Sequence, residues 1–257
     1  PLLPALETLL TRLEFLSSEP RMVAQRQIAL GLALQPYLER GGGALLSPLP
    51  EETGLANLIL YADFHPQDGQ LTLIEQLRDM ITEHIPQEER GWLDPLKHSY
   101  LDLAEFLATD EQEQCLLFRS IGNARVYRVP GGAFSKGLRP GQVLLTRLIR
   151  EPGDVEWERA VIAGTAILLS NEDAKGLLNA SLDYRRQVEI SSGSFELGDW
   201  PEFAKRYGHV LLWAFARMRL AALLDAVVSI RYVVKGGQPY LYALALYDHS
   251  EYAYMGD

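Results

Sequence analysis

The spacing of hydrophobic residues predicts helices in the first 40 residues of the chain. One helix face carries Leu6, Leu9, Leu10, Leu13 and Leu16. A second helix is predicted from Ser18 toward Arg40, with a kink at Pro36, because proline interrupts the helical hydrogen-bond ladder. Residues 41–54 are rich in Gly and Pro and predict a loop or linker. The apolar run 55–64 fits a helix or a strand equally well.

Two short motifs predict further helix starts before residue 110. Thr72 followed by Glu75 is a capping-box pattern, in which each residue can bond the backbone N–H of the other. Asp94 followed by Pro95 is typical of a cap and a first-turn proline. The buried stripe of this last helix is predicted to consist of Leu96, Tyr100, Leu103 and Leu107.

From Cys115 to Ser170 the pattern changes to short apolar runs, rich in Val, Ile and Leu, that Gly and Pro separate. These runs predict strands near residues 115–121, 124–129, 142–149 and 159–169. Several short strands joined by tight turns are typical of a small antiparallel sheet that curls toward a barrel. We therefore expect a barrel-like β module in the middle of the chain.

Helical signals return after this module. Ser170 with Asp173 predicts a capped helix that runs to about Arg186. Asp199, Pro201 and Glu202 predict the start of the longest helix, which is apolar nearly all round beyond Leu220 and should be enclosed there by other elements. The chain then predicts a β-hairpin with arms near 228–234 and 240–247.

These elements together predict an α+β fold. It consists of N-terminal helices, a central antiparallel β module that is barrel-like, and a long C-terminal helix with a β-hairpin. The predicted boundaries are 1–110 for the helical region, 111–170 for the β module and 171–257 for the C-terminal part. We expect the three parts to pack as one compact unit.

Two ordered motifs carry a resemblance to known proteins. They are WLDPLKHSYLDLAEF at 92–106 and FSKGLRPGQVLLTRL at 134–148. Over residues 70–170 the chain resembles uncharacterised bacterial proteins related to SEC-C-motif-associated proteins, in which a helical part precedes a small β module. The resemblance implies this architecture and a bacterial origin, and it transfers no activity. Gln142 departs from the pattern, which usually has Asp there, and a single cysteine cannot form the zinc tail that some of these proteins carry.

Composition narrows the protein classes. The chain has 257 residues, 47% of them hydrophobic and 23% charged, which are ordinary values for a globular protein. Its only cysteine, Cys115, excludes an internal disulfide and a cysteine-based zinc site within one chain. The start of the chain lacks the pattern of a secretory signal, and the apolar stretch 208–230 contains charged residues, so we predict a buried helix there and no membrane span. A cytoplasmic location is the expectation.

A cluster of positive charge lies in this otherwise acidic chain, whose formal net charge is −10. Residues 116–150 contain seven basic side chains and no acidic one. One hypothesis is a nucleic-acid or anion-binding face formed by Arg125, Arg128, Lys136 and Arg139. The other is internal pairing with the acidic helices of the same chain, which we favour because alternation along strands disperses the arginines. Arg147 shares its face with apolar residues and is therefore expected to lie partly buried against a carboxylate.

The residues capable of catalysis or metal binding form no local constellation. The histidines are His65, His84, His98, His209 and His249, and no two of them have the spacing of a local ligand pair, so we predict no metal and no cofactor. His98 and Ser99 near Asp94 and Asp102 suggest a catalytic triad, but adjacent residues on a helix point in different directions. Cys115, at the start of an apolar strand, is expected to be a buried, inert thiol.

The C-terminal region is rich in tyrosine, and Tyr252 and Tyr254, beyond the predicted strand, are candidate interface residues for a homodimer or another protein partner. The leading hypothesis from sequence is a non-enzymatic interaction or regulatory protein. The alternatives are a nucleic-acid-binding protein that uses the 116–150 module, and a hydrolase whose site is assembled from distant residues.

Overall fold

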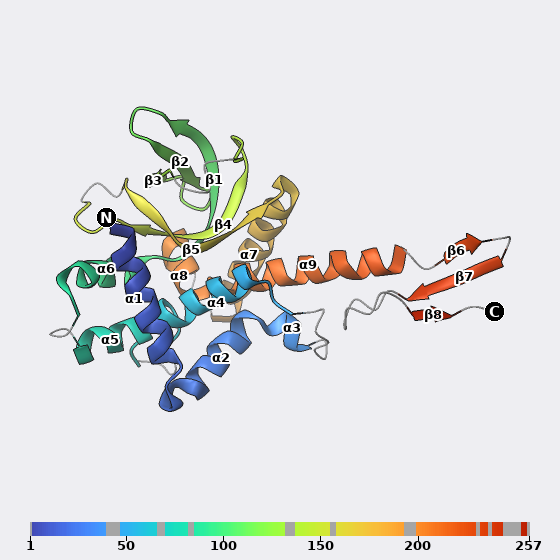
Figure 1. Cartoon of the computed structure of the whole chain (residues 1–257), viewed down its shortest axis with the longest axis horizontal. Helices are drawn as coiled ribbons and strands as arrows, with labels where there is room; N and C mark the ends of the chain where they lie inside the picture. Colours follow the sequence, from blue (N-terminus) through green and yellow to red (C-terminus); the bar gives the residue numbers. More distant parts are fainter. Residues whose placement is uncertain are drawn as a thin grey trace.

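In the computed structural model of the chain, helices cover one side of a curled antiparallel sheet, and a long helix leads toward a second, smaller sheet (Figure 1). The structure describes residues 2–39, 47–65, 70–81, 85–131, 137–154, 158–192, 199–229, 232–235, 238–243 and 253–255. The α+β class predicted from the sequence is confirmed.

The helices form two groups along the chain. Before the sheet lie α1 (Leu2–Ser17), the 3-10 turn η1 (Pro20–Met22), α2 (Val23–Ala33), α3 (Gln35–Glu39), α4 (Pro50–Ala62), α5 (Leu73–Ile81) and α6 (Gln87–His98). After the sheet lie α7 (Asn171–Ser192), α8 (Trp200–Tyr207) and α9 (His209–Ser229). The predicted stripe of α1 is buried at Leu6, Leu9, Leu13 and Leu16, and the chain breaks between α2 and α3 just before Pro36.

Helix α4 corrects the predicted linker, since residues 50–54 are helical. Pro50 occupies the first turn, where its missing N–H costs nothing, and the backbone N–H of Leu49 donates to Glu52 Oε2 at 2.8 Å. Residues 55–62, which periodicity does not assign, are helical and are mostly buried, so no polar face reveals the helical period. A Cβ at Gly54 would lie 2.8 Å from Thr165 Cγ2, so the helix backbone packs directly on β5.

The capping motifs predicted at Thr72, Ser170 and Asp199 are confirmed. The Thr72 N–H donates to Glu75 Oε2 at 2.8 Å, and the Asp173 N–H donates to Ser170 Oγ at 3.0 Å. Asp199 Oδ1 accepts from the Glu202 N–H at 3.2 Å. The helix that follows Ser170 continues past the predicted end to Ser192, and the predicted longest helix is divided at position 208 into α8 and α9.

The main sheet has five antiparallel strands in the order β3-β2-β1-β4-β5. The strands are β1 (Leu101–Asp110), β2 (Cys115–Ser120), β3 (Val126–Pro130), β4 (Val143–Arg150) and β5 (Ala160–Leu169). The last four confirm the predicted strands within a few residues.

Strand β1 contradicts the helix that was predicted from Asp94 through Leu107. Helix α6 begins earlier, at Gln87, contains Pro95 in its last turns and ends at His98, after which Ser99 is extended. The next residues hydrogen-bond to β2 on one side and β4 on the other. Both faces of Leu101–Ala104 are buried, and the sequence alternates between apolar and polar residues only over Leu101, Asp102 and Leu103, which is too short a run to mark a strand. The sheet therefore begins ten residues before the predicted module boundary.

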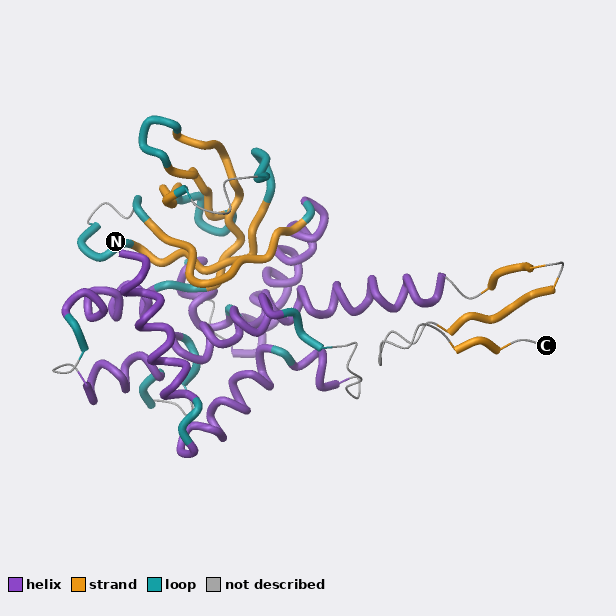
Figure 2. Tube along the Cα trace, viewed as in Figure 1, coloured by secondary structure: helices purple, strands orange, loops and turns teal. Residues whose placement is uncertain are grey.

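The sheet curls without closing into a barrel, which corrects the barrel-like prediction (Figure 2). Its edges approach at one place, where Arg128 and Arg159 form an isolated parallel bridge. The β4–β5 register shifts between Thr146 and Leu148, and Gly164 in β5 has a φ of 67°. Such irregularities bend a sheet locally, and a single bridge is too little to join β3 and β5 along their length.

Two apolar clusters fill the structure on either side of the sheet. The larger joins the helices to the helix-facing side of β1, β4 and β5, and it includes Trp92, Leu145 and Phe203. The smaller lies within the curl and includes Phe106 and Phe118, whose ring centroids are 5.5 Å apart. The sheet is thus buried on both faces over much of its length.

The C-terminal strands form a three-stranded antiparallel sheet with the order β6-β7-β8. They are β6 (Tyr232–Lys235), β7 (Gln238–Ala243) and β8 (Ala253–Met255). The hairpin is confirmed, but its first arm begins later than predicted, because residues 228 and 229 still belong to α9. Tyr252 lies outside the described residues, and for Tyr254 the structure describes the backbone, which pairs with Tyr242 in β7. Within the part of the chain that is described, no helix has the length and apolar character needed to cross a membrane.

Candidate functional site: an ionic cluster beside a cleft

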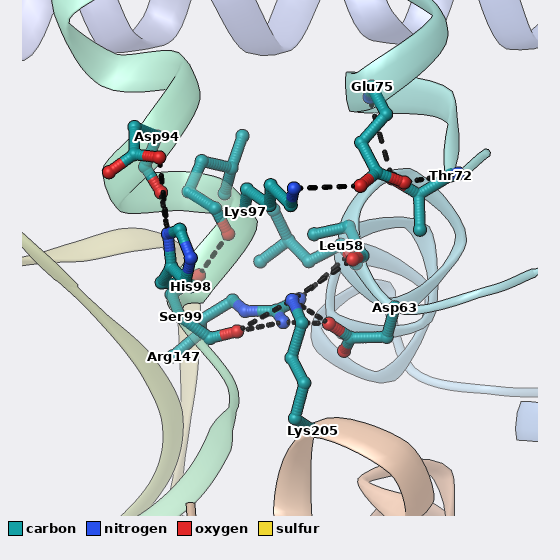
Figure 3. A network of polar contacts seen from close by, with 12 residues as sticks. Leu58, Asp63, Thr72, Glu75, Asp94, Lys97, His98, Ser99, Arg147 and Lys205 are labelled. Atoms are coloured by element: carbon teal, nitrogen blue, oxygen red, sulfur yellow. Dashed lines mark hydrogen bonds and ion pairs between the residues drawn. The ribbon is translucent and has the colours of Figure 1, made fainter. Parts of the chain in front are cut away.

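Arg147 is a charged side chain buried at the interface between the sheet and the helices. It projects from β4 at the point where the β4–β5 register shifts, and it is 1% exposed. Its guanidinium donates to the carbonyl oxygens of Leu58 at 2.8 Å and of Ser99 at 2.7 Å, and it lies 2.5 Å from Asp63 Oδ1 (Figure 3). The expectation that Arg147 is buried against a carboxylate is therefore confirmed.

Lys205 of α8 shares the same carboxylate. Its Nζ lies 2.7 Å from Asp63 Oδ1 and donates to the carbonyl oxygens of Ala62 and Ser99, both at 3.0 Å (Figure 3). An ammonium has three N–H donors, so these partners occupy all of them. Asp63, Arg147 and Lys205 are called the ionic cluster below. The cluster joins the C-terminal end of α4, the residue that follows α6, strand β4 and helix α8.

The ionic cluster contains more positive than negative charge. Arginine is always protonated in proteins, so Arg147 and Lys205 together contribute two positive charges against the single carboxylate of Asp63. Burial lowers the pKa of Lys205 to about 8; Asp63 opposes this shift and Arg147 adds to it. Lys205 is thus still mostly protonated at pH 7. One positive charge among the described residues of the cluster has no carboxylate of its own.

A cleft of about 680 Å³ opens beside the ionic cluster. Its walls come from α2, the end of α4, the segment that leads into α5, and the junction of α8 with α9. They consist of Leu32, Ile59, Asp63, Phe64, His65, Gln70, Leu71, Glu75, Lys205, Arg206, Gly208 and His209. This volume is in the range of sites that hold small organic molecules. We call it the α4–α8 cleft.

The carboxylate of Glu75 on the cleft wall is already neutralised. Its Oε1 lies 2.8 Å from Lys97 Nζ, and its Oε2 accepts from the N–H and hydroxyl groups of Thr72 (Figure 3). Burial opposes ionisation here, but the bonds from Lys97 and Thr72 outweigh it and lower the pKa of Glu75 to about 2. Glu75 is therefore ionised and paired with Lys97 at neutral pH, and among the groups that act on the pKa of Lys205 it has a smaller effect than Asp63.

Two groups at the cleft retain hydrogen-bonding capacity. Asp63 Oδ2 is buried and accepts no hydrogen bond from any described residue, and the side chain as a whole is 5% exposed. Burial lowers the pKa of His209 to about 4, with Asp63 opposing the shift, so its imidazole is neutral at pH 7. A neutral imidazole offers one donor and one acceptor. A buried carboxylate oxygen without a donor is unusual in a folded protein and indicates that a further partner belongs there.

The buried carboxylate of Glu52, in contrast to that of Asp63, has hydrogen-bond donors at both oxygens. Glu52 is completely buried and accepts from Tyr37 Oη at 2.6 Å, from the Leu49 N–H at 2.8 Å and from Arg219 Nη1 at 3.3 Å. Arg219 also donates to the Ser47 carbonyl at 3.1 Å. Both oxygens of Glu52 have partners, and this network ties α9 to α3 and α4. We interpret it as structural, in contrast to the ionic cluster.

Three of the basic residues predicted as an anion face, Arg125, Arg128 and Arg139, lie in the described part of the chain. Arg128 is ion-paired with Glu158, while Arg125 and Arg139 are exposed in turns, where their backbone N–H groups bond Asn123 and Gln142. Lys136 lies outside the described residues.

Another arginine of the basic window shows how these charges are paired. Arg119 lies 2.5 Å from Glu105, which is a residue of β1 and not of a helix. Of Arg119, Arg128 and Arg147, only Arg147 shows the expected pairing with the helical part of the chain, through Asp63 at the end of α4. Arg119 pairs within the sheet, and Arg128 pairs with Glu158, which precedes β5.

The possible triad around His98 is not assembled. Ser99 Oγ donates to the Leu96 carbonyl at 2.7 Å, and His98 Nδ1 lies 2.9 Å from the carbonyl oxygen of Asp94. Asp102 is buried on β1 and accepts from Trp200 Nε1 at 2.9 Å. The neighbouring cavity, about 30 Å³, has room for little more than a water molecule. Cys115 is buried as expected, and burial raises the pKa of its thiol.

Sequence reasoning missed Asp63 and Lys205 because the ionic cluster draws on positions 63, 147 and 205, which no local motif connects. The one signal available was Arg147, a charge on an otherwise apolar strand face. Comparison of the chain with protein-family models, with curated proteins and with solved structures gives no match. The resemblance of residues 70–170 to SEC-C-motif-associated proteins therefore stays a prediction.

Proposed function

We propose that this chain is a non-enzymatic regulatory protein whose α4–α8 cleft binds a small anionic ligand. The observation that supports the proposal is the sharing of one carboxylate, Asp63, by the buried Arg147 and the partly buried Lys205 beside the cleft. A buried positive charge without its own counter-ion is costly, and an anion in the cleft would supply that counter-ion.

The same geometry favours binding over catalysis. Lys205 is held by three acceptors, so neither its lone pair nor a spare proton is available to a substrate at neutral pH. The cluster joins the helices to the sheet, so occupation of the cleft is expected to stabilise the contacts between these two layers. A ligand-dependent change in stability is the form of regulation that this arrangement supports.

The other parts of the functional hypothesis are also proposals. A hydrolase whose site is assembled from distant residues is an alternative proposal; a local site at His98 and Ser99 is less supported, because the hydroxyl of Ser99 is bonded to a backbone carbonyl. Nucleic-acid binding is less supported, because Arg128 is engaged by Glu158. We also propose a bacterial, cytoplasmic protein that associates with itself or another protein through its C-terminal strands; β6 and β8 are the outer strands of that sheet as described, and an outer strand can pair with another chain.

The test is thermal unfolding with propyl phosphate or glycerol phosphate, compared with chloride at equal ionic strength. At a ligand concentration about ten times the Kd, an anion in the cleft should raise the unfolding temperature by roughly 2–4 °C. Lys205→Met removes the excess charge and should abolish the rise, whereas Lys175→Met, on the exposed face of α7, should keep it. Recovery of the esters unchanged after incubation is expected for a binding protein. No rise with either ester would overturn the proposal.

A further inference from the structure

The α4–α8 cleft has different chemistry at its rim and at its floor. Arg206 is exposed at the rim, where its guanidinium lies over the Tyr207 ring at 5.5 Å from the centroid. Leu32, Phe64 and Leu71 provide apolar surface. The floor carries Asp63 from the ionic cluster, so an acceptor lies deep in the cleft and a cation lies at its entrance.

The unpaired oxygen of Asp63 restricts the kind of group that can reach the floor. Oδ1 already serves both Arg147 and Lys205, and Oδ2 is an acceptor without a donor among the described residues. An ammonium group could donate to it, but it would add a third cation where positive charge is already in excess. A hydroxyl group donates without adding charge. The floor therefore favours a neutral O–H donor.

The rim restricts the opposite end of the ligand. Arg206 adds a positive charge to that of the ionic cluster, whereas Glu75 is neutralised by Lys97. Guanidinium groups bind carboxylates and phosphates through paired N–H donors. The charges of the cleft thus complement an anionic group, and His209, neutral at pH 7, can donate or accept beside it.

We propose that the ligand of the α4–α8 cleft is a hydroxylated organic anion, whose hydroxyl donates to Asp63 Oδ2 and whose phosphate or carboxylate faces Arg206. This inference rests on the proposed function and narrows it from any small anion to one class. Hydroxy acids and the phosphate esters of polyols share this chemistry, and a cleft of about 680 Å³ accommodates either.

Calorimetric titration of the full chain with matched ligands tests the class. Glycerol phosphate and propyl phosphate differ in their hydroxyls, as lactate and propionate do, while glycerol lacks the anion. We expect each hydroxylated anion to bind roughly tenfold or more tightly than its partner, because only its hydroxyl can donate to Asp63 Oδ2, which has no donor among the described residues of the free protein. Glycerol alone should bind at least tenfold more weakly than its phosphate.

Variants locate the two ends of the ligand. Arg206→Gln should weaken both members of a pair by a similar factor of roughly five or more, while Arg186→Gln, at an exposed position of α7, should leave affinity unchanged. Asp63→Asn should reduce the difference in affinity between the hydroxylated anion and its analogue. If that variant does not fold, the titrations of the wild-type chain with the matched ligands still test the inference.

Each outcome separates the inference from the proposal it rests on. Equal affinity within each pair overturns the inference and leaves an anion-binding cleft. Equal binding of glycerol and glycerol phosphate overturns the anionic part. If no anion of either pair binds, the proposed function itself fails.

Discussion

Replacing Asp63 with Asn should destabilise the protein more than replacing Lys205, one of the two cations that it serves, with Met. The substitution keeps the size of the side chain and removes the charge, so Arg147 and Lys205 stay buried together with no carboxylate. Removing one partner of a buried ion pair typically costs about 3–5 kcal/mol of unfolding free energy. We expect Asp63→Asn to fall in that range.

Lys205→Met should cost less, although it removes the same ion pair. The variant leaves Arg147 and Asp63 as a neutral pair, and the Ser99 carbonyl still accepts from Arg147 at 2.7 Å. The group that loses its donor is the Ala62 carbonyl, and such a loss typically costs about 1–3 kcal/mol. The two variants therefore differ because only one of them leaves unbalanced charge.

Urea denaturation at pH 7 measures both free energies. A matched control is Asp183→Asn, whose pair with Arg186 is exposed and should change stability by less than about 0.5 kcal/mol. The double variant Asp63→Asn with Lys205→Met should cost less than the sum of the single variants, because it leaves one unpaired cation in place of two. If Lys205→Met proves as costly as Asp63→Asn, the account of excess positive charge is wrong.

Three further expectations follow from other contacts. Gly54→Ala should destabilise the protein by about 1–3 kcal/mol, because the new Cβ would lie 2.8 Å from Thr165 Cγ2. In a Thr165→Ser background, which lacks that methyl group, the same substitution should be neutral or stabilising by up to about 1 kcal/mol, because alanine favours the helix α4 more than glycine does. Urea denaturation of the four chains measures this difference, and an equal cost in both backgrounds would refute the contact. Burial raises the pKa of Asp102 to about 6, above its value in the unfolded chain, so the ionised carboxylate destabilises the folded protein above pH 6, and this destabilisation disappears toward pH 4. Asp102→Asn can still accept from Trp200, so the unfolding free energy of the variant relative to the wild type should increase by about 1–3 kcal/mol from pH 4 to pH 7.5. A difference that does not vary with pH would count against this expectation. Because Arg128 is paired with Glu158, the chain should elute from heparin below about 0.15 M salt, and firm retention above that would revive the nucleic-acid hypothesis.

Local chemistry made much of the fold predictable. The caps at Thr72, Ser170 and Asp199 act within four residues, so the sequence carries them completely. Strands β2 to β5 were predictable because Gly and Pro turns separate their apolar runs. The burial of Arg147 followed from the alternation of side chains along β4.

The errors arose where tertiary packing decides the structure. Helix α4 is buried on most sides, which hides its period, and the first half of β1 is buried on both faces, which hides its alternation. The leucines after Asp94 have helical spacing, yet hydrogen bonds to β2 and β4 on both sides hold residues from Leu101 onward in a strand. The partners of Arg147 come from distant segments, so its carboxylate could be anticipated as a type of residue but not as Asp63.

The most direct test of the account is the pKa of Lys205, measured by NMR on chain labelled at lysine and assigned with Lys205→Met. We expect a pKa of about 8 for Lys205 in the free protein, because burial and the neighbouring Arg147 lower the pKa while Asp63 opposes this shift. The account also predicts that the pKa rises when glycerol phosphate is added, because an anion in the cleft supplies the missing counter-ion. A pKa near the ordinary value of about 10.4 in the free protein, or one that the ligand leaves unchanged, would contradict it.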